Sequence, residues 1–214
     1  MMTDWEIRRS IVHYGKLVHR AGFVAATDGN ISVRMMEDRL MITASGSALG
    51  NLDPAALLYV DFSGQVLQGR GKPSSELPMH LTIYKKRPDV LAIIHTHPPI
   101  STAISIAKES LSQAVLPEVV IMFGEIPIAP YATPSTDEGA KVVESLIEHH
   151  DVIILDHHGA VTVGKSLEDA FFKLEKLEHA AKTLLTAKQL GKISPLSEEE
   201  VKKLKAVRQQ LGYK

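Results

Sequence analysis

Three histidines at the ends of two apolar segments are the residues of this 214-residue chain best suited to chemistry. His95 and His97 follow Ile93-Ile94, and His158 comes shortly after Ile154-Leu155. In an extended strand, side chains two residues apart point to the same face, so the imidazoles of His95 and His97 can reach one ion. The alternative for an isolated His-x-His is a pair of polar residues at the mouth of a strand.

A second apolar strand that ends in histidine strengthens the metal interpretation. Three neutral imidazoles leave an open coordination position, which is typical of catalytic rather than structural zinc. The chain has no cysteine, so imidazole and carboxylate are the strong metal ligands that it can offer. Adjacent residues of an extended chain point to opposite sides, so we take His158 as the ligand and place His157 behind the ligands or at the surface.

Three short segments of small residues could bind an anion. Ser74 and Ser75 come just before a predicted helix, whose N-terminus carries a partial positive charge that favours phosphate. The segments 28–30 (Asp-Gly-Asn) and 43–47 (Thr-Ala-Ser-Gly-Ser) have the same character. Ordinary helix capping explains the serines equally well, and the other two segments could be plain turns.

The elements that must position these residues alternate between extended and helical patterns. The sequence predicts helices over residues 4–21, 77–86, 100–108, 136–149, 167–190 and 197–211, and strands over 31–34, 40–43, 58–62, 65–68, 90–97, 119–123, 151–155 and 160–163. Short turns between consecutive strands favour antiparallel pairing, and the helices must cover the sheet faces. We therefore expect one α/β domain over residues 1–214, with three layers (α/β/α) around a central, mostly antiparallel sheet.

Composition narrows the possible partners. The chain has 24 basic and 25 acidic residues and a net charge of -1, so no long-range field favours nucleic acid or an anionic membrane surface. Its longest apolar runs are far shorter than the roughly 20 residues that span a bilayer. A basic start followed by an apolar stretch, as in a secretory signal, is not evident. We expect a cytoplasmic protein that binds a small molecule, with no nucleic acid and no membrane partner.

Five motifs together resemble the class II aldolase/adducin family, in their order and spacing and over nearly the whole chain. The motifs are Gly29-Asn30-Ile31-Ser32, Ser45-Gly46, Ser74-Ser75-Glu76, His95-x-His97 and His158-Gly159. The resemblance implies an α/β/α fold, which agrees with the expectation above. It also implies a zinc-dependent homotetramer with fourfold symmetry and active sites near subunit interfaces.

The resemblance also implies roles for individual residues. The zinc ligands match His95, His97 and His158, and the catalytic acid/base, which also approaches zinc in the resting enzyme, matches Glu76. The phosphate-binding positions match Gly29, Asn30, Ser45, Gly46, Ser74 and Ser75. The implied reaction is cleavage of a ketose 1-phosphate, such as fuculose 1-phosphate or a related deoxy-sugar phosphate, into dihydroxyacetone phosphate and an aldehyde. That reaction is the work of a metal-dependent aldehyde-lyase of carbohydrate metabolism.

One departure concerns the aldehyde side of the site. Fuculose-phosphate members of the family use a tyrosine from a neighbouring subunit, on the loop before the Ile-Pro-x-Ala-Pro-Tyr segment, whereas residues 117–124 here contain no tyrosine. Tyr213 could match a second family tyrosine. The substrate therefore stays open, and a deoxypentulose phosphate is one possibility.

Other members of the family leave further alternatives for the reaction. They include a pentulose-phosphate 4-epimerase, a methylthioribulose-phosphate dehydratase and a decarboxylase of a phosphorylated sugar acid, which share the metal frame. A non-catalytic adducin-like module is disfavoured, because it would not need to keep all three histidines.

Overall fold

A single mixed sheet of eight strands organises this protein in a computed structural model that describes residues 3–36 and 38–213. The strands are β1 (Asn30–Met36), β2 (Arg39–Ile42), β3 (Leu58–Asp61), β4 (Val66–Gln68), β5 (Ala92–Thr96), β6 (Ile128–Ala129), β7 (Val152–Leu155) and β8 (Gly159–Gly164). The helices are α1 (Asp4–Arg20), α2 (Leu77–Lys86), α3 (Pro99–Ile106), α4 (Pro117–Met122), α5 (Asp137–Glu144), α6 (Leu167–Leu190) and α7 (Glu198–Gln210), with short 3-10 turns at Leu49–Asn51 and Pro54–Ala56.

The sheet runs in the order β4-β3-β2-β1-β5-β8-β7-β6. Every described strand pair is antiparallel except β6 with β7, where the chain returns through α4 to the edge of the sheet. The adjacent strands β5, β8 and β7 are buried along their whole length, as a sheet covered on both faces requires. The mostly antiparallel sheet expected from the sequence is confirmed.

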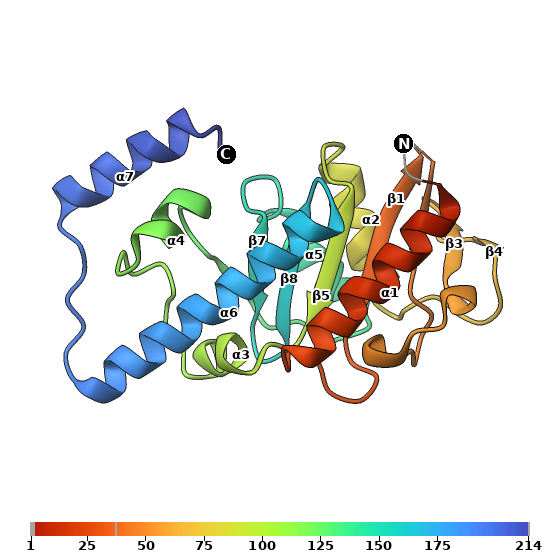
Figure 1. Ribbon diagram of the computed structural model, residues 1–214, viewed down its shortest axis with the longest axis horizontal. Coiled ribbons are helices and arrows are strands. Elements are labelled where there is room, and N and C mark those ends of the chain that lie inside the picture. Colours follow the sequence, from red (N-terminus) through yellow and green to blue (C-terminus); the bar gives the residue numbers. More distant parts are fainter. Residues whose placement is uncertain (1–2, 37, 214) are drawn as a thin grey trace.

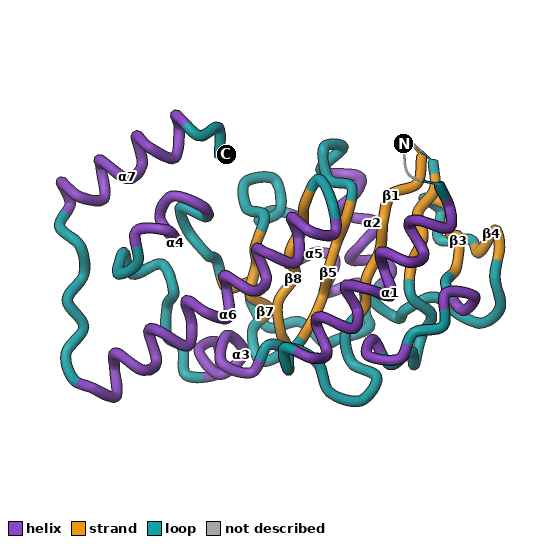
Figure 2. The backbone as a smooth tube through the Cα atoms, viewed as in Figure 1, coloured by secondary structure: helices purple, strands orange, loops and turns teal. Residues whose placement is uncertain are grey.

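Helices cover both faces of the sheet, which gives three layers. In Figure 1, α1 and α6 cross one face, and α2 and α5 lie behind the sheet. Figure 2 shows the same arrangement as a tube, with the strands between the two sets of helices. Ile11 of α1 and Leu174 of α6 are in one buried cluster with Ile94, whereas Leu77 and Ile83 of α2 are in another with strand residues.

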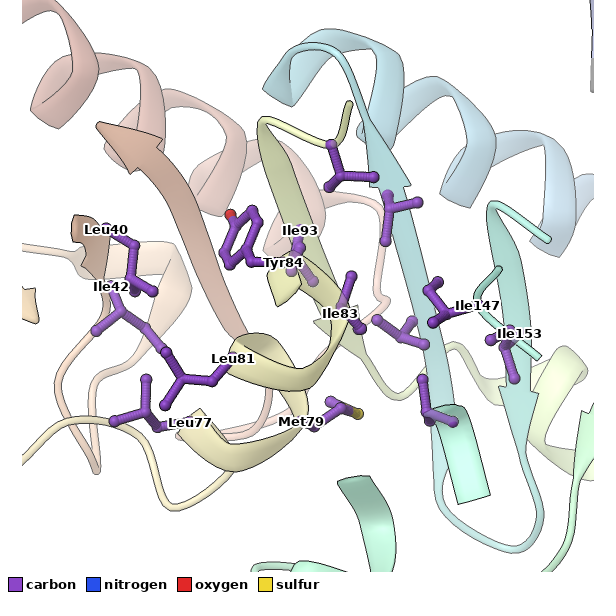
Figure 3. Close-up of a cluster of buried hydrophobic side chains, with 14 of the residues drawn as sticks. Leu40, Ile42, Leu77, Met79, Leu81, Ile83, Tyr84, Ile93, Ile147 and Ile153 are labelled. Carbon is purple, nitrogen blue, oxygen red and sulfur yellow. The ribbon is translucent and has the colours of Figure 1, made fainter. Parts of the chain in front are cut away.

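The core under α2 shows how the helix pattern anchors that layer. Figure 3 shows Leu77, Leu81, Ile83 and Tyr84 of α2 beside side chains of the strands and Ile147, which follows α5. Ile83 and Tyr84 are almost completely buried, and a fully buried aliphatic side chain contributes roughly 1.5–3 kcal/mol of transfer free energy. Packing therefore holds α2 firmly against the sheet, and the residues at its first turn are held with it.

The prediction of a strand over residues 119–123 is wrong, because this segment forms α4. The β-branched run Val119-Val120-Ile121 favours a strand by propensity, but Pro117 stands at the first helical position, where proline is well tolerated. In the helix, Val119, Val120 and Phe123 are buried, and two of them join the cluster beneath α6. Burial of that helical face outweighs the weaker local preference.

Two further differences concern ends of elements. The helix expected over 136–149 ends as α5 at Glu144, and the strand expected over 90–97 is shorter, from Ala92 to Thr96. A capping box begins α7, because Ser197 and Glu200 bond each other's backbone N–H. In α7, Arg208 donates to the carbonyl of Ile121, which ties the C-terminal helix to α4. No helix within the described residues is long and apolar enough to cross a membrane.

Candidate functional site

Strand register brings the candidate ligands together at one end of the sheet centre. Asn30 at the start of β1 pairs with His95 of β5, and His95 in turn pairs with Val161 of β8. His158 lies in the tight connection between β7 and β8, where its backbone N–H donates to the carbonyl of Leu155. The ends of β5 and of the β7–β8 hairpin therefore meet at one point, as the period-2 pattern predicts.

The three imidazoles converge closely. Their ring centroids are 4.8 to 5.1 Å apart, and one nitrogen of each lies within 4.8 Å of those of the others. The Nε2 atoms of His95 and His97 are 3.2 Å apart. Two nitrogens bound tetrahedrally to one zinc at about 2.0–2.1 Å would be about 3.3 Å apart. The spacing of His95 and His97 therefore fits a shared ion.

The contacts of the Nδ1 atoms of His95 and His97 also fit metal binding. Nδ1 of His95 donates to the carbonyl oxygen of Ala160 at 3.0 Å, which leaves Nε2 as the ring atom that faces the other imidazoles and Glu76. Nδ1 of His97 lies 3.4 Å from a carboxylate oxygen of Asp28. A carbonyl or carboxylate behind the ring is the usual way in which proteins fix the tautomer of a metal-binding histidine. The donor set present therefore suits a divalent ion.

Glu76 completes the cluster from the N-terminus of α2. Its carboxylate oxygens lie 2.8 Å from Nε2 of His95 and 3.6 Å from Nε2 of His158. Burial alone would raise the pKa of Glu76, but its interactions with His95, His158 and Asn30 outweigh burial and hold that pKa well below its usual range. Glu76 is therefore ionised at neutral pH.

The imidazoles of His97 and His158 are held neutral. Burial, followed by repulsion from His95, lowers the pKa of His158 to about 4 and also lowers the pKa of His97. A neutral imidazole offers a lone pair to a metal, whereas a protonated one does not. His97 and His158 are thus in the protonation state that metal binding requires.

A hollow of about 210 Å³ opens beside the cluster. All six residues considered for phosphate binding line it, namely Gly29, Asn30, Ser45, Gly46, Ser74 and Ser75. Among the described residues, the backbone N–H groups of Gly46 and Ser75 have no hydrogen-bond acceptor, so both are free to donate to a ligand. Ser74 acts partly as a cap, because its hydroxyl accepts from the backbone N–H of Glu76.

Two glycines are required by close packing at the site. Gly29 has φ of 77°, and a Cβ there would lie 2.7 Å from Val24 and 2.9 Å from the carbonyl of His95. Gly159 packs against Thr96 and His97, and a Cβ would lie 2.8 Å from Cδ2 of the His97 ring. The Gly that follows His158 therefore allows the two ligand-bearing segments to touch.

A buried chain of hydrogen bonds behind Glu76 was not predicted from the sequence. Nδ2 of Asn30 donates to Glu76 at 3.4 Å, so its Oδ1 faces Nε2 of His80 at 2.6 Å. An amide oxygen accepts only, so Nε2 of His80 carries the proton and Nδ1 accepts from the hydroxyl of Ser32 at 2.6 Å. The hydroxyl of Tyr84 then donates to Ser32 at 2.9 Å. Through these hydrogen bonds, Tyr84, Ser32, His80 and Asn30 fix the position of the Glu76 carboxylate.

His80 is fully buried, and burial, followed by repulsion from His95, lowers its pKa to about 3. The sequence pattern of a helical histidine indicated only packing or exposure. The signal that could have identified its role is its spacing, because His80 follows Glu76 by four residues and therefore lies on the same helix face. His157, as expected, is not with the ligands: its φ is 59° and its Nδ1 pairs with Asp156 at 2.8 Å.

Known proteins share both the sequence pattern and the fold. The family model for the class II aldolase and adducin N-terminal domain matches residues 9–185. The chain is 33% identical over 207 residues to a 3-oxo-tetronate 4-phosphate decarboxylase of Haemophilus influenzae, covering 95% of this chain and 98% of the relative. It is 39% identical over 166 residues to an L-fuculose phosphate aldolase of Methanococcus vannielii, covering 78% and 88%.

Solved structures agree with these matches. The crystal structure of YgbL from Klebsiella pneumoniae superposes with a TM-score of 0.87 at 31% identity and covers 95% of this chain and all (100%) of that one. The family model alone spans well over half of the sequence. The chain therefore belongs to the class II aldolase and adducin family.

Proposed function

We propose that this protein is a metal-dependent lyase that cleaves a ketose 1-phosphate into dihydroxyacetone phosphate and an aldehyde. The observation that carries the proposal is the convergence of three imidazoles and the carboxylate of Glu76 beside a hollow rich in hydrogen-bond donors. His95, His97 and His158 would hold one ion per subunit, zinc by preference for this nitrogen donor set, although another divalent metal is compatible. The chain would act as a single domain of its family over residues 1–214.

The metal and the hollow have separate tasks in this proposal. A divalent ion bound at the three imidazoles would supply Lewis acidity, stabilising negative charge that develops on a substrate oxygen as a carbon–carbon bond breaks. The hollow would bind the phosphate group and so hold the substrate in a fixed position beside the metal. The residues that would bind the phosphate are Gly29, Asn30, Ser45, Gly46, Ser74 and Ser75. Holding the substrate in this way removes rotational freedom that otherwise opposes the reaction.

Glu76 would move the proton. As an ionised carboxylate of low pKa it is a weak base, and in the resting protein it lies against His95. A substrate that occupies the site would displace it from the imidazoles and leave it free to act as the acid/base. It would then deliver a proton to the carbon left by the broken bond, or remove that proton in the condensation direction. The amide of Asn30 would steer the carboxylate in both directions.

A second, small cavity of about 20 Å³ lies on the other side of Glu76 and has room for a group about the size of a methyl. This cavity borders Glu76 and His158 on the side towards α5, with apolar walls from Met79, Ala132 and Leu155. The described residues that line it include the acids Glu76 and Asp156 and no lysine or arginine. Walls of this kind suit the short aliphatic end of an aldehyde, and Asp156 adds no uncompensated charge there because it pairs with Lys108 at 2.5 Å.

A decarboxylase of a phosphorylated 3-oxo sugar acid is the second candidate. It is favoured by the match to the 3-oxo-tetronate 4-phosphate decarboxylase of Haemophilus influenzae, which extends over nearly the full length of both chains. Both reactions break a carbon–carbon bond next to a carbonyl group, and both leave negative charge to be stabilised at the same place. The metal cluster, the hollow and Glu76 therefore serve either reaction.

Product analysis separates the two reactions. The zinc-loaded protein is incubated with a panel of ketose 1-phosphates, including fuculose 1-phosphate and 5-deoxyribulose 1-phosphate, and with 3-oxo-tetronate 4-phosphate. Release of dihydroxyacetone phosphate from one of the ketose phosphates supports the aldolase. Release of carbon dioxide from the 3-oxo acid, without cleavage of any ketose phosphate, contradicts it and supports the decarboxylase.

The proposal extends to the assembly and its location. We expect a cytoplasmic homotetramer with active sites near the subunit interfaces, as the family resemblance implies. Aromatic side chains that are more than half exposed, Trp5, Tyr131 and Phe172, offer surface for contacts between copies. Light scattering that gives the mass of a single chain at micromolar concentration would contradict this assembly.

A further inference from the structure

A serine hydroxyl from the far side of the hollow faces the phosphate-binding residues. The hydroxyl oxygens of Ser75 and Ser135 lie 2.7 Å apart although the residues are 60 positions apart in the chain. Ser135 belongs to the loop between β6 and α5, and it lines both the hollow and the cavity beyond Glu76. It therefore stands at the boundary between the two parts of the site.

The start of α5 holds this loop in place. The hydroxyl of Thr136 caps the helix by accepting from the backbone N–H of Glu138 at 3.2 Å. The carboxylate of Glu138 in turn accepts from the backbone N–H of Thr133 at 2.9 Å. Between these contacts, Ser135 has φ of 62°, a left-handed conformation that a residue with a side chain seldom adopts. The loop is thus pre-organised with the hydroxyl of Ser135 beside Ser75.

Because the hollow has no basic side chain among its described residues, each hydroxyl there matters for the binding of an anion. Among the described residues that line it, none is lysine or arginine, and two are the acids Asp28 and Glu76. An anion in this hollow would be bound mainly by neutral N–H and O–H donors and by the metal cluster at its edge. A hydrogen bond to a charged group contributes more than one between neutral groups, so the loss of one donor is costly.

We propose that Ser135 is a further ligand of the substrate's phosphate group and closes the hollow from the α5 side; this inference rests on the proposed function. Each hydroxyl carries one proton, and the bond between Ser75 and Ser135 uses one of the two. The second proton is free to donate to a phosphate oxygen. When both hydroxyls turn to the ligand, the pair supplies two donors, one from each side of the hollow.

Phosphate binding by the zinc-loaded protein tests the inference without relying on turnover. Inorganic phosphate is titrated into the wild type and into Ser135→Ala and Ser135→Gly by calorimetry. Both variants lose the hydroxyl, but glycine relieves the left-handed backbone and alanine does not. We expect the dissociation constant for phosphate to rise by about tenfold to a hundredfold in both variants. Ser145→Ala, an exposed serine at the other end of α5, should leave it unchanged.

The possible results separate the inference from the function beneath it. Wild-type affinity in both Ser135 variants overturns the inference and leaves the proposed function standing. Weak binding by Ser135→Ala with normal binding by Ser135→Gly also overturns it, because the backbone and not the hydroxyl is then responsible. If the wild type itself binds no phosphate, the phosphate role of the hollow fails, and the inference fails with it. With an active substrate, the variants should show a raised KM and an unchanged kcat.

Discussion

Replacing His80 in two different ways should separate its role at the site from its role in the core. His80 is fully buried and makes two hydrogen bonds of 2.6 Å, one to Asn30 and one with Ser32. An asparagine at this position can reach where Nδ1 stands and so bond Ser32. A glutamine can reach where Nε2 stands and so bond Asn30. Each variant keeps one bond and loses the other.

The magnitudes follow from the partners left behind. A buried polar group without a partner costs about 1–3 kcal/mol, so His80→Asn and His80→Gln should each lower the free energy of unfolding by about that amount. His80→Leu leaves both partners unpaired and should cost about 2–6 kcal/mol. Activity should not follow stability, because only the bond to Asn30 leads on to Glu76. We expect His80→Asn to lower kcat by about a hundredfold and His80→Gln to lower it by less than tenfold.

Urea denaturation gives the stabilities, and steady-state kinetics on the best substrate of the panel give kcat. Zinc content is measured on the same samples, so that a lost metal is not mistaken for a misplaced carboxylate. If His80→Asn and His80→Gln are equally active at equal zinc content, the hydrogen bonds from His80 to Glu76 do not position the acid/base.

Three further predictions concern packing, pH and the buried guanidinium of Arg87. Gly159→Ala should sharply weaken zinc binding, because the new Cβ would lie 2.8 Å from Cδ2 of His97 and displace that ring. Gly139→Ala is the control, since a Cβ there meets nothing within 4 Å. Competition with a chromogenic chelator measures the zinc affinities, and equal affinity of the two variants would refute the packing argument. In the folded protein His80 has a pKa of about 3, whereas in the unfolded chain it binds a proton below about pH 6.5. Between these two values the free energy of unfolding should therefore fall as the pH falls, and it should fall by up to about 1.4 kcal/mol per pH unit more in the wild type than in His80→Gln. Parallel profiles of urea stability against pH for the two proteins would refute this. Arg87→Met should lower the free energy of unfolding in urea by about 1–3 kcal/mol, because the buried carbonyl of Ile147 loses its donor at 2.9 Å while Asp151 keeps its pair with Lys173. Zinc affinity should not change. A loss below about 0.5 kcal/mol, well under the cost of about 1 kcal/mol for an unpaired buried group, would contradict this.

The sequence predicts the parts of the site that follow from local periodicity. His95 and His97 lie on one face because strand side chains alternate, and His158 meets them because β7 and β8 form a hairpin beside β5. The three-layer fold follows from the order of helices and strands in the same way. The shared face of His95 and His97 and the β7–β8 hairpin need only short-range information. The pairing of that hairpin with β5 joins segments far apart in the chain, and the family resemblance indicated it.

The missed features depend on contacts between distant segments. His80 bonds Asn30 and Ser32, which are 50 and 48 residues away, across the interface of α2 with β1. Ser135 reaches Ser75 only because α5 packs against α2 in the folded chain. The strand predicted at 119–123 failed for the same reason, since the cluster beneath α6 decides its conformation. Local propensity carries no information about such partners.

Zinc binding at the three imidazoles is the central claim, and X-ray absorption spectroscopy tests it most directly. The protein is exposed to zinc, freed of excess metal by gel filtration, and measured together with His95→Ala and His158→Ala. We predict one zinc per chain with nitrogen or oxygen neighbours at about 2.0–2.1 Å, the multiple scattering of three imidazoles, and loss of the metal from both variants. Zinc that stays bound with an unchanged spectrum in either variant would contradict the claim.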